Sequence, residues 1–392
     1  MRTAVRIYLD YNATAPVPTE VAAEVARVLR EEPGNPSSVH AFGQRAKACL
    51  DEARQSVGAL IEAEPSEVVF TASGTEANNL ALRGAAEALA VTGRRHIVTT
   101  GIEHEAVLAT LKALERQGCT VTVLPVGETG VLAPEVLAAA ITPETGLVSV
   151  MTANNEVGTI QPIADLAAVA RSHRAIFHTD AVQAAGKLPL SVRLLGIDLL
   201  SLSGHKFGSP KGVGALWIRR GVRLIAQMTG GRQERNRRAG TENVSSIAGL
   251  GVAARLARER LVTHATSIGA LRDHLERGIL AAVPHVAVNG DPARRVANTT
   301  NISFDGIEAE SLLIALDLEG IAVSTGSACS SGSLEPSHVL KAMGFSNARS
   351  RNSLRFSLGP STTAEEVDAV IATLPRLVTK LRGLGRTASA VR

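Results

Sequence analysis

The chain has 392 residues, of which 45% are hydrophobic and 20% charged, a composition typical of a folded globular protein rather than a disordered or fibrous one. Its 41 basic and 37 acidic residues give a formal net charge of +4, which is too small to indicate nucleic-acid binding. The sequence shows neither a signal peptide nor an apolar stretch of about 20 residues, so we expect no membrane insertion and a cytoplasmic location.

The chain contains only three cysteines, Cys49, Cys119 and Cys329. They are too few and too scattered for a disulfide framework or a cluster of metal ligands, so we expect a reducing compartment and no metal site.

Between residues 66 and 220, short β-branched runs alternate with amphipathic helical stretches, a pattern typical of a parallel sheet covered by helices. The predicted strands are Val68–Thr71, Ile97–Thr100, Val121–Pro125, Leu147–Thr152, Ile176–Thr179, Leu199–Ser203 and Val213–Ile218.

The pattern changes after about residue 255 to a long helical stretch, two short strands and a terminal helix. The predicted strands are Asn301–Phe304 and Ser353–Ser357, and a Ser/Gly-rich loop at 324–333 lies between them. We expect a smaller α+β domain here. Thr362 and Glu365 could form a capping box for the terminal helix, which Pro375 should kink.

Polar residues follow most of the predicted strands of the larger sheet. Because ligands collect outside the carboxyl ends of strands in open α/β sheets, these positions form the candidate site. They are Ser73-Gly74-Thr75, Glu103-His104, Asn154-Asn155, Asp180 to Gln183, and Ser203-Gly204-His205-Lys206.

Three of these positions indicate specific chemistry. Gly74 and Thr75 open a helix whose N–H groups could hold a phosphate, although taken alone these residues are more often explained by a simple helix cap. Asp180 could pair with a protonated pyridine nitrogen, or cap a turn. Lys206 lies in a tight glycine-rich loop after an apolar strand and could form a Schiff base, whereas most lysines are merely solvated.

His104 could stack on a flat ring or move a proton, or it could be structural. Cys329 lies among small residues, so we expect an accessible thiol, whereas Cys49 and Cys119 fit inert packing. Arg355 is flanked by apolar residues, which fits either a buried ion pair or a grip on a substrate carboxylate.

Together these residues resemble the cysteine desulfurase family, a class V branch of fold-type I pyridoxal-phosphate (PLP) enzymes. The resemblance runs from Tyr8 to about Leu381, and its motifs occur in family order. They include YLDYNATAP, GNPSSVHAFG, SGTEANN, EHEAV, NNEVGTIQP, DAVQAAGKLP, SGHKFGSPKGVGAL, GTEN, STGSACSSGSLEPSHVL and SLRFSLG.

The resemblance implies a mostly parallel seven-stranded sheet in a large domain, 15–255, and a small domain made of 1–14 and 256–392. It also implies roles for individual residues. Lys206 would be the Schiff-base lysine, with the other cofactor contacts made by Gly74, Thr75, His104, Asn155, Asp180, Gln183, Ser203, His205 and, from a second subunit, Thr241. Asn155 and Arg355 would hold the substrate carboxylate.

The implied reaction transfers sulfur from L-cysteine to Cys329 as a persulfide and leaves L-alanine. The implied partners are a second copy of the chain and a sulfur-acceptor protein, such as an iron-sulfur scaffold or a thiolation enzyme, and Cys329 could transiently ligate a cluster. Alternatives are a selenocysteine lyase, a class V aminotransferase or, more remotely, a catalytically silent sulfur-transfer scaffold.

One basic cluster remains. Residues 232–238 contain four arginines, which is typical of a solvated loop. Its position just before Gly240-Thr241 instead favours a role at the active site or the dimer interface, so we predict no direct contact with nucleic acid.

Overall fold

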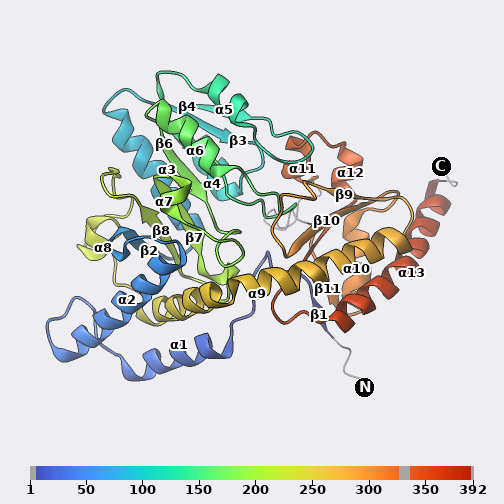
Figure 1. Ribbon diagram of the computed structural model, residues 1–392, viewed down its shortest axis with the longest axis horizontal. Coiled ribbons are helices and arrows are strands. Elements are labelled where there is room, and N and C mark those ends of the chain that lie inside the picture. Colours follow the sequence, from blue (N-terminus) through green and yellow to red (C-terminus); the bar gives the residue numbers. More distant parts are fainter. Residues whose placement is uncertain (1–5, 326–335, 390–392) are drawn as a thin grey trace.

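The computed structural model describes residues 6–325 and 336–389. A seven-stranded sheet forms its larger part, in the strand order β2-β8-β7-β6-β5-β3-β4 (Figure 1). The strands are β2 (Val68–Thr71), β3 (His96–Thr100), β4 (Thr120–Leu124), β5 (Thr145–Ser149), β6 (Ile176–Asp180), β7 (Leu199–Ser203) and β8 (Gly214–Ile218). All pairings are parallel except those that β8 makes with β2 and β7, which confirms the mostly parallel sheet.

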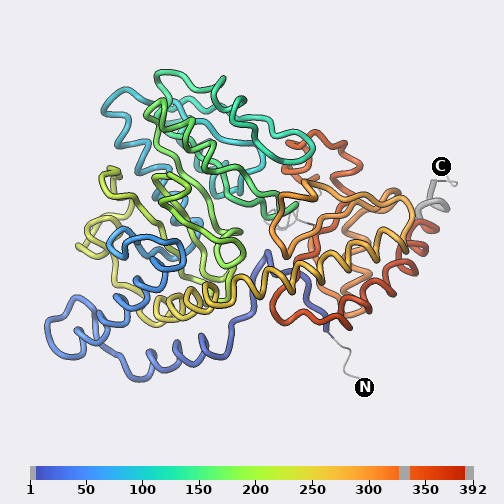
Figure 2. Tube along the Cα trace, in the orientation of Figure 1, coloured from blue at the N-terminus to red at the C-terminus, as the bar shows by residue number. Residues whose placement is uncertain are grey.

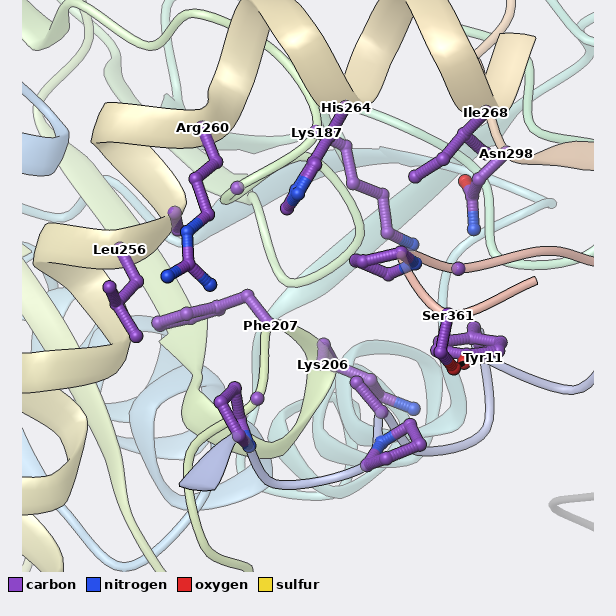
Figure 3. A pocket seen from close by; sticks show the side chains of 18 of the residues that line it. Tyr11, Lys187, Lys206, Phe207, Leu256, Arg260, His264, Ile268, Asn298 and Ser361 are labelled. Atoms are coloured by element: carbon purple, nitrogen blue, oxygen red, sulfur yellow. Dashed lines mark hydrogen bonds between the residues drawn. The ribbon is translucent and has the colours of Figure 1, made fainter. Parts of the chain in front are cut away.

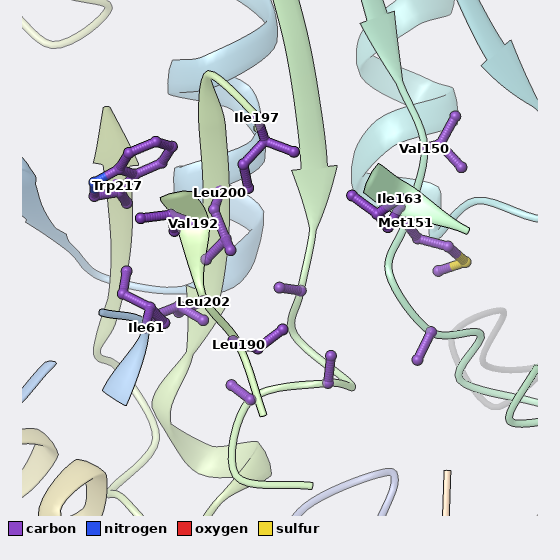
Figure 4. Packing of buried hydrophobic residues seen from close by; sticks show 14 of the residues in the cluster. Ile61, Val150, Met151, Ile163, Leu190, Val192, Ile197, Leu200, Leu202 and Trp217 are labelled. Carbon is purple, nitrogen blue, oxygen red and sulfur yellow. The ribbon is translucent and has the colours of Figure 1, made fainter. Parts of the chain in front are cut away.

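Most of these strands are buried at every position, which explains why helices cover both faces of the sheet. Successive residues such as Leu199 and Leu200 point to opposite faces, and each joins a different hydrophobic cluster. One face packs against α3 (Gly74–Ala90) and α4 (Glu105–Glu115). The other packs against α2 (Ala41–Leu60) and α6 (Ile163–Ser172) and contains the buried Trp217 and Ile163 (Figure 4).

The C-terminal part has its own hydrophobic core around a three-stranded antiparallel sheet in the order β12-β10-β9. Its elements are β9 (Val286–Asn289), β10 (Thr299–Phe304), α10 (Ala309–Leu318), α11 (His338–Ala342), α12 (Asn347–Arg351), β12 (Ser353–Ser357) and α13 (Ala364–Ser389). Ile7 and Leu9 belong to this core because β1 (Ile7–Tyr8) pairs with β11 (Ile321–Ala322).

Helix α9 (Val244–Ala282) connects the two parts, and its buried residues join both cores (Figure 1). The N-terminal segment makes a second connection, since its trace runs from the small sheet back to α1 (Thr19–Glu31) (Figure 2). The remaining short elements are η1 (Pro65–Glu67), α5 (Pro134–Ala140), α7 (Val192–Leu195), η2 (Gly204–Lys206) and α8 (Gln233–Asn236).

The structure differs from the predicted elements in a few places. The predicted strand Leu147–Thr152 starts and ends earlier, as β5, and β9 was not predicted. The capping box of α13 is formed by Thr363 and Glu366, one residue later than predicted, through reciprocal bonds of 3.2 and 3.0 Å. The predicted box was therefore wrong by one position.

The arginine-rich segment 232–238 is not a freely solvated loop. Glu234 has a φ of +44°, and its buried carboxylate accepts two bonds from Arg54, at 2.7 and 2.8 Å. Arg238 pairs with Glu76 at 2.8 Å, in the first turn of α3. These ion pairs fix the segment to α2, which contains Arg54, and to α3, which contains Glu76.

No helix within residues 6–325 and 336–389 combines the length and the apolar character needed to cross a bilayer.

Candidate active site

A cavity of about 330 Å³ lies at the carboxyl ends of the parallel strands. It brings together the residues predicted from the strand ends, because parallel strands deliver their last residues to one edge of a sheet. The lining residues are Asn12, Ala13, Ser73, Gly74, Thr75, Asn78, His104, Met151, Asn155, Asp180, Val182, Gln183, Ser203, His205, Lys206 and Arg355.

Lys206 enters this cavity from the short turn η2, directly after β7. Its Nζ donates to the main-chain oxygens of Asn12, at 2.7 Å, and Ala13, at 2.8 Å. The amine is thus held by neutral carbonyls at the cavity wall.

Asp180 ends β6 and is 3% exposed. Asn78 Nδ2 donates to its Oδ2 at 2.7 Å, and the N–H of Val182 donates to its Oδ1 at 2.9 Å. These bonds orient the carboxylate, and a carboxylate held in this way suits a cationic nitrogen of a ligand ring.

The N-terminus of α3 forms the opposite, electropositive end of the cavity. Ser73 caps the helix by accepting from Glu76 N at 3.1 Å. A side chain at Gly74 would come within 2.9 Å of Val182 and 3.0 Å of Ser203, so only glycine fits there. Thr75 adds a hydroxyl group beside these N–H groups. This end suits an anion such as a phosphate.

His205 lies beside the same end, where its ring contacts Thr14 Oγ1 at 3.2 Å. Burial, with a smaller effect of Lys206 and Lys211, lowers the pKa of His205 to about 4. The ring is therefore neutral near pH 7 and can serve as a hydrogen-bond donor to an anion.

His104 is the cap residue of α4, and its Nδ1 accepts the N–H of Ala106 at 3.0 Å. This bond leaves Nε2 as the ring atom that carries a proton. The neighbouring Glu103 is fully buried, and burial raises its pKa to about 8. Thr100 donates to its Oε1 at 2.7 Å, so Glu103 supports the turn that presents His104.

Arg355 projects from β12 of the small sheet into the cavity and is 3% exposed. Its Nη2 lies 2.6 Å from Asp10 Oδ1, and its Nη1 donates to the main-chain oxygen of Asn155 at 2.9 Å. The buried ion pair that the sequence left open is present. Arg355 also lines the cavity, so the second interpretation stands beside it.

The sequence also drew attention to Thr241 and to the three cysteines. Thr241 is exposed and does not line the cavity of its own chain. Cys329 lies outside the described residues. Cys49 and Cys119 are half-buried, and burial raises the pKa of both thiols, which fits their predicted packing role.

Sequence reasoning missed Asn12, Asn78 and Lys187. Asn12 and Lys187 occur within the motifs YLDYNATAP and DAVQAAGKLP, and Asn78 within SGTEANN. The motifs therefore marked these segments, but not the roles of these three side chains. Their importance depends on contacts between distant segments, which no local pattern predicts.

A second cavity, of about 390 Å³, lies on the other side of Lys206. Figure 3 shows Lys187 and Lys206 entering it from separate segments, with Arg260 and His264 projecting from α9. Most of its other lining residues are apolar, including Leu256.

The chain matches the family model described as aminotransferase class V over residues 7–370. It is 50% identical over 378 residues to a cysteine desulfurase of Trichormus azollae, covering 96% of this chain and 94% of that protein. It is 48% identical over 379 residues to the cysteine desulfurase NifS of Azotobacter vinelandii, with 96% and 94% covered.

Solved structures agree with these relatives. A NifS-like protein superposes with a TM-score of 0.90 at 37% identity, covering 96% of this chain and all of that one. DndA from Streptomyces lividans superposes with a TM-score of 0.78 at 40% identity, covering 89% and 98%.

Proposed function

Since the chain belongs to the class V aminotransferase family and is a PLP-dependent cysteine desulfurase, we propose how its side chains hold the cofactor and cysteine. The observation that carries the proposal is the 330 Å³ cavity, which is lined by Lys206, a buried carboxylate and the N-terminus of α3. The charges match the cofactor, since PLP has a cationic ring nitrogen and an anionic phosphate.

Each end of the cavity would bind one part of PLP. Lys206 would bind it covalently, Asp180 would face the ring nitrogen, His104 would stack on the ring, and Gln183 would lie near the ring hydroxyl. Phosphate would be held by Gly74, Thr75, Ser203 and His205. When bound, PLP withdraws electrons from the α-carbon of cysteine.

The substrate carboxylate would be held by Arg355 and Asn155. The guanidinium of Arg355 is already aligned by Asp10, and its Nε has no hydrogen-bond partner among the described residues. A buried, oriented arginine can bind a carboxylate at little entropic cost. Lys206, when not bonded to PLP, would move protons to and from the substrate.

Cys329 would take the sulfur. Its thiolate would attack the sulfur of cysteine, so that a sulfur–sulfur bond forms while the carbon–sulfur bond breaks. The electron pair of the broken bond stays on the substrate carbon, which then takes a proton and becomes alanine. Cys329 is left as a persulfide.

We further propose a cytoplasmic homodimer in which Thr241 contacts the phosphate in the partner's site. Its exposure in the single chain is consistent with that role. Within the chain, residues 15–255 would form the PLP-binding domain, and 1–14 with 256–392 the small domain. The persulfide would pass to an acceptor protein for iron-sulfur assembly or thiolation.

The test is borohydride reduction of the PLP-loaded protein, followed by peptide mass mapping and by measurement of alanine released from L-cysteine. We expect the reduced cofactor on Lys206 and one alanine for each sulfur released. A label on another lysine would contradict the proposed role of Lys206. A label on Lys206 without alanine formation would contradict the assignment of the substrate groups.

A further inference from the structure

Asn12 follows Tyr11 in the N-terminal segment, where this segment leaves the small sheet. The N-terminal segment, the small sheet and the edge of the larger sheet meet at this residue. It is 2% exposed and borders the active-site cavity. The neighbouring Asp10 forms a bridge with Ser357 of β12, so the segment is anchored to the small sheet just before Asn12.

The main-chain oxygen of Asn12 faces the larger sheet. It accepts from Lys206 Nζ at 2.7 Å and from Gln183 Nε2 at 2.9 Å. A carbonyl oxygen has two lone pairs, so both are used. This one atom therefore orients two residues that the proposed function places around PLP.

The side chain of Asn12 ties the same residue to the small sheet and to the larger one. Its Nδ2 donates to Thr299 Oγ1 at 2.9 Å and to Asn155 O at 3.1 Å. Its Oδ1 accepts from Asn298 Nδ2 at 3.0 Å and from Lys187 Nζ at 2.8 Å. With Ser357 Oγ accepting from its N–H at 3.0 Å, every hydrogen-bonding group of Asn12 is engaged.

Lys187 completes the arrangement. Its Nζ donates to Gln183 Oε1 at 2.7 Å as well as to Asn12, and no carboxylate among the described residues pairs with it. Burial, followed by repulsion from Lys206 and Arg355, lowers its pKa well below the usual range. Lys187 thus acts as a hydrogen-bond donor that fixes the Gln183 amide from behind.

We propose that Asn12 is a positioning residue: its side chain fixes the carbonyl oxygens of Asn12 and Ala13 that hold Lys206, and thereby registers the lysine against the small sheet. This inference rests on the proposed role of Lys206. It gives the N-terminal segment a function in the reaction, in addition to its packing.

The chemistry of the contacts explains why this position needs asparagine. Aspartate would place an oxygen against the main-chain oxygen of Asn155, which has no proton to donate. Alanine would leave Asn298 and Lys187 without their acceptor and would free the carbonyl oxygens to move. Small displacements of a reacting group lower rates strongly even when binding is retained.

The test compares Asn12→Ala with Asn289→Ala, a matched loss of a buried asparagine. Asn289 bonds Asn301, Ser353 and Arg349 within the small domain. For each variant we would measure the melting temperature, the rate at which apoprotein captures PLP covalently, and kcat and KM for cysteine. Covalent capture reports on Lys206 without requiring turnover.

We expect Asn12→Ala to slow covalent capture and to lower kcat by roughly tenfold each, with KM changed less than about threefold. Asn289→Ala should lose thermal stability but keep both rates. If Asn12→Ala does not fold, Thr299→Val removes one acceptor isosterically and should show the same pattern more weakly. Equal capture rates and kcat in Asn12→Ala and Asn289→Ala would overturn the proposal.

The two hypotheses can fail separately. A borohydride label on a lysine other than Lys206 in the unaltered protein would contradict the proposed function. A normal label on Lys206 combined with unaltered capture in Asn12→Ala would contradict only the role of Asn12.

Discussion

Lys206 borders two cavities of similar volume, about 330 and 390 Å³, that differ in their charges. The active-site cavity is lined by the carboxylate of Asp180 and the N-terminus of α3, together with His104 and Arg355. The second cavity contains the basic side chains of Lys187 and Arg260 but no carboxylate among its described lining residues. Its walls are mostly apolar.

This difference shows that complementary charge, rather than volume, distinguishes the site of chemistry. A PLP ring with its phosphate requires an anion and an anion-binding end at opposite ends of one cavity, and only the first cavity offers both. Lys206 and Lys187 also differ in the cavities that they border. Lys206 borders both cavities, whereas Lys187 borders only the second.

The largest expected effect is that of replacing Lys206, which tests the comparison between the two lysines. Lys206→Ala should abolish the borohydride-fixed cofactor and lower alanine formation roughly a thousandfold or more, because the covalent anchor and the proton carrier are both lost. Mass mapping after reduction and an alanine assay would measure this.

Lys187→Met is the matched control, and it should retain the fixed cofactor on Lys206. A label that survives in Lys206→Ala but disappears in Lys187→Met would reverse the assignment of the two cavities.

A second prediction concerns Cys329, the residue proposed to take the sulfur from cysteine. No described residue that lines either cavity is a cysteine. Cys329→Ser should therefore bind PLP normally but release less than about one hundredth of the sulfide, because a hydroxyl cannot replace the thiolate nucleophile. Sulfide release and the absorption spectrum would be measured together.

Cys119→Ser serves as the control, because Cys119 packs beside the cluster of α3 and α4. It should keep the sulfide release of the unaltered protein. Unimpaired sulfide release by Cys329→Ser would refute the proposal that Cys329 takes the sulfur from cysteine.

A third prediction compares the arginines of the two cavities. Arg355→Lys should raise the KM for cysteine roughly 10- to 100-fold, because lysine keeps the charge but loses the paired N–H donors. Arg260→Lys should leave KM unchanged, since Arg260 lies in the second cavity and pairs with Glu20 at 2.8 Å. A similar KM for cysteine in both variants would contradict the proposal that Arg355 binds the substrate carboxylate.

The sequence predicted the larger sheet well because each strand is a short run rich in β-branched or apolar residues, and polar residues follow most of these runs. Asp180 and Lys206 could be placed at one edge for that reason. The contacts of Asn12 could not be predicted, because they join residues as far apart as Asn12 and Asn298. The predicted capping box failed because Thr362 and Thr363 are adjacent and both precede a glutamate by three residues.

The smallest expected effect concerns Glu103, the buried acid beneath His104. Its pKa is about 8, above the usual value of 4.5, so the folded protein binds the proton more tightly than the unfolded chain. The free energy of unfolding should therefore fall as pH rises from about 5 to 8, because the folded protein must give up this proton.

Glu103→Gln, which cannot ionise but retains an oxygen acceptor for Thr100 and the N–H of Met151, should lose this contribution. Compared with the unaltered protein, it should become relatively more stable as pH rises over that range. Urea unfolding of both proteins at pH 5, 6.5 and 8 would measure the difference. Parallel curves would mean that Glu103 is already ionised in the folded protein, which would contradict the raised pKa.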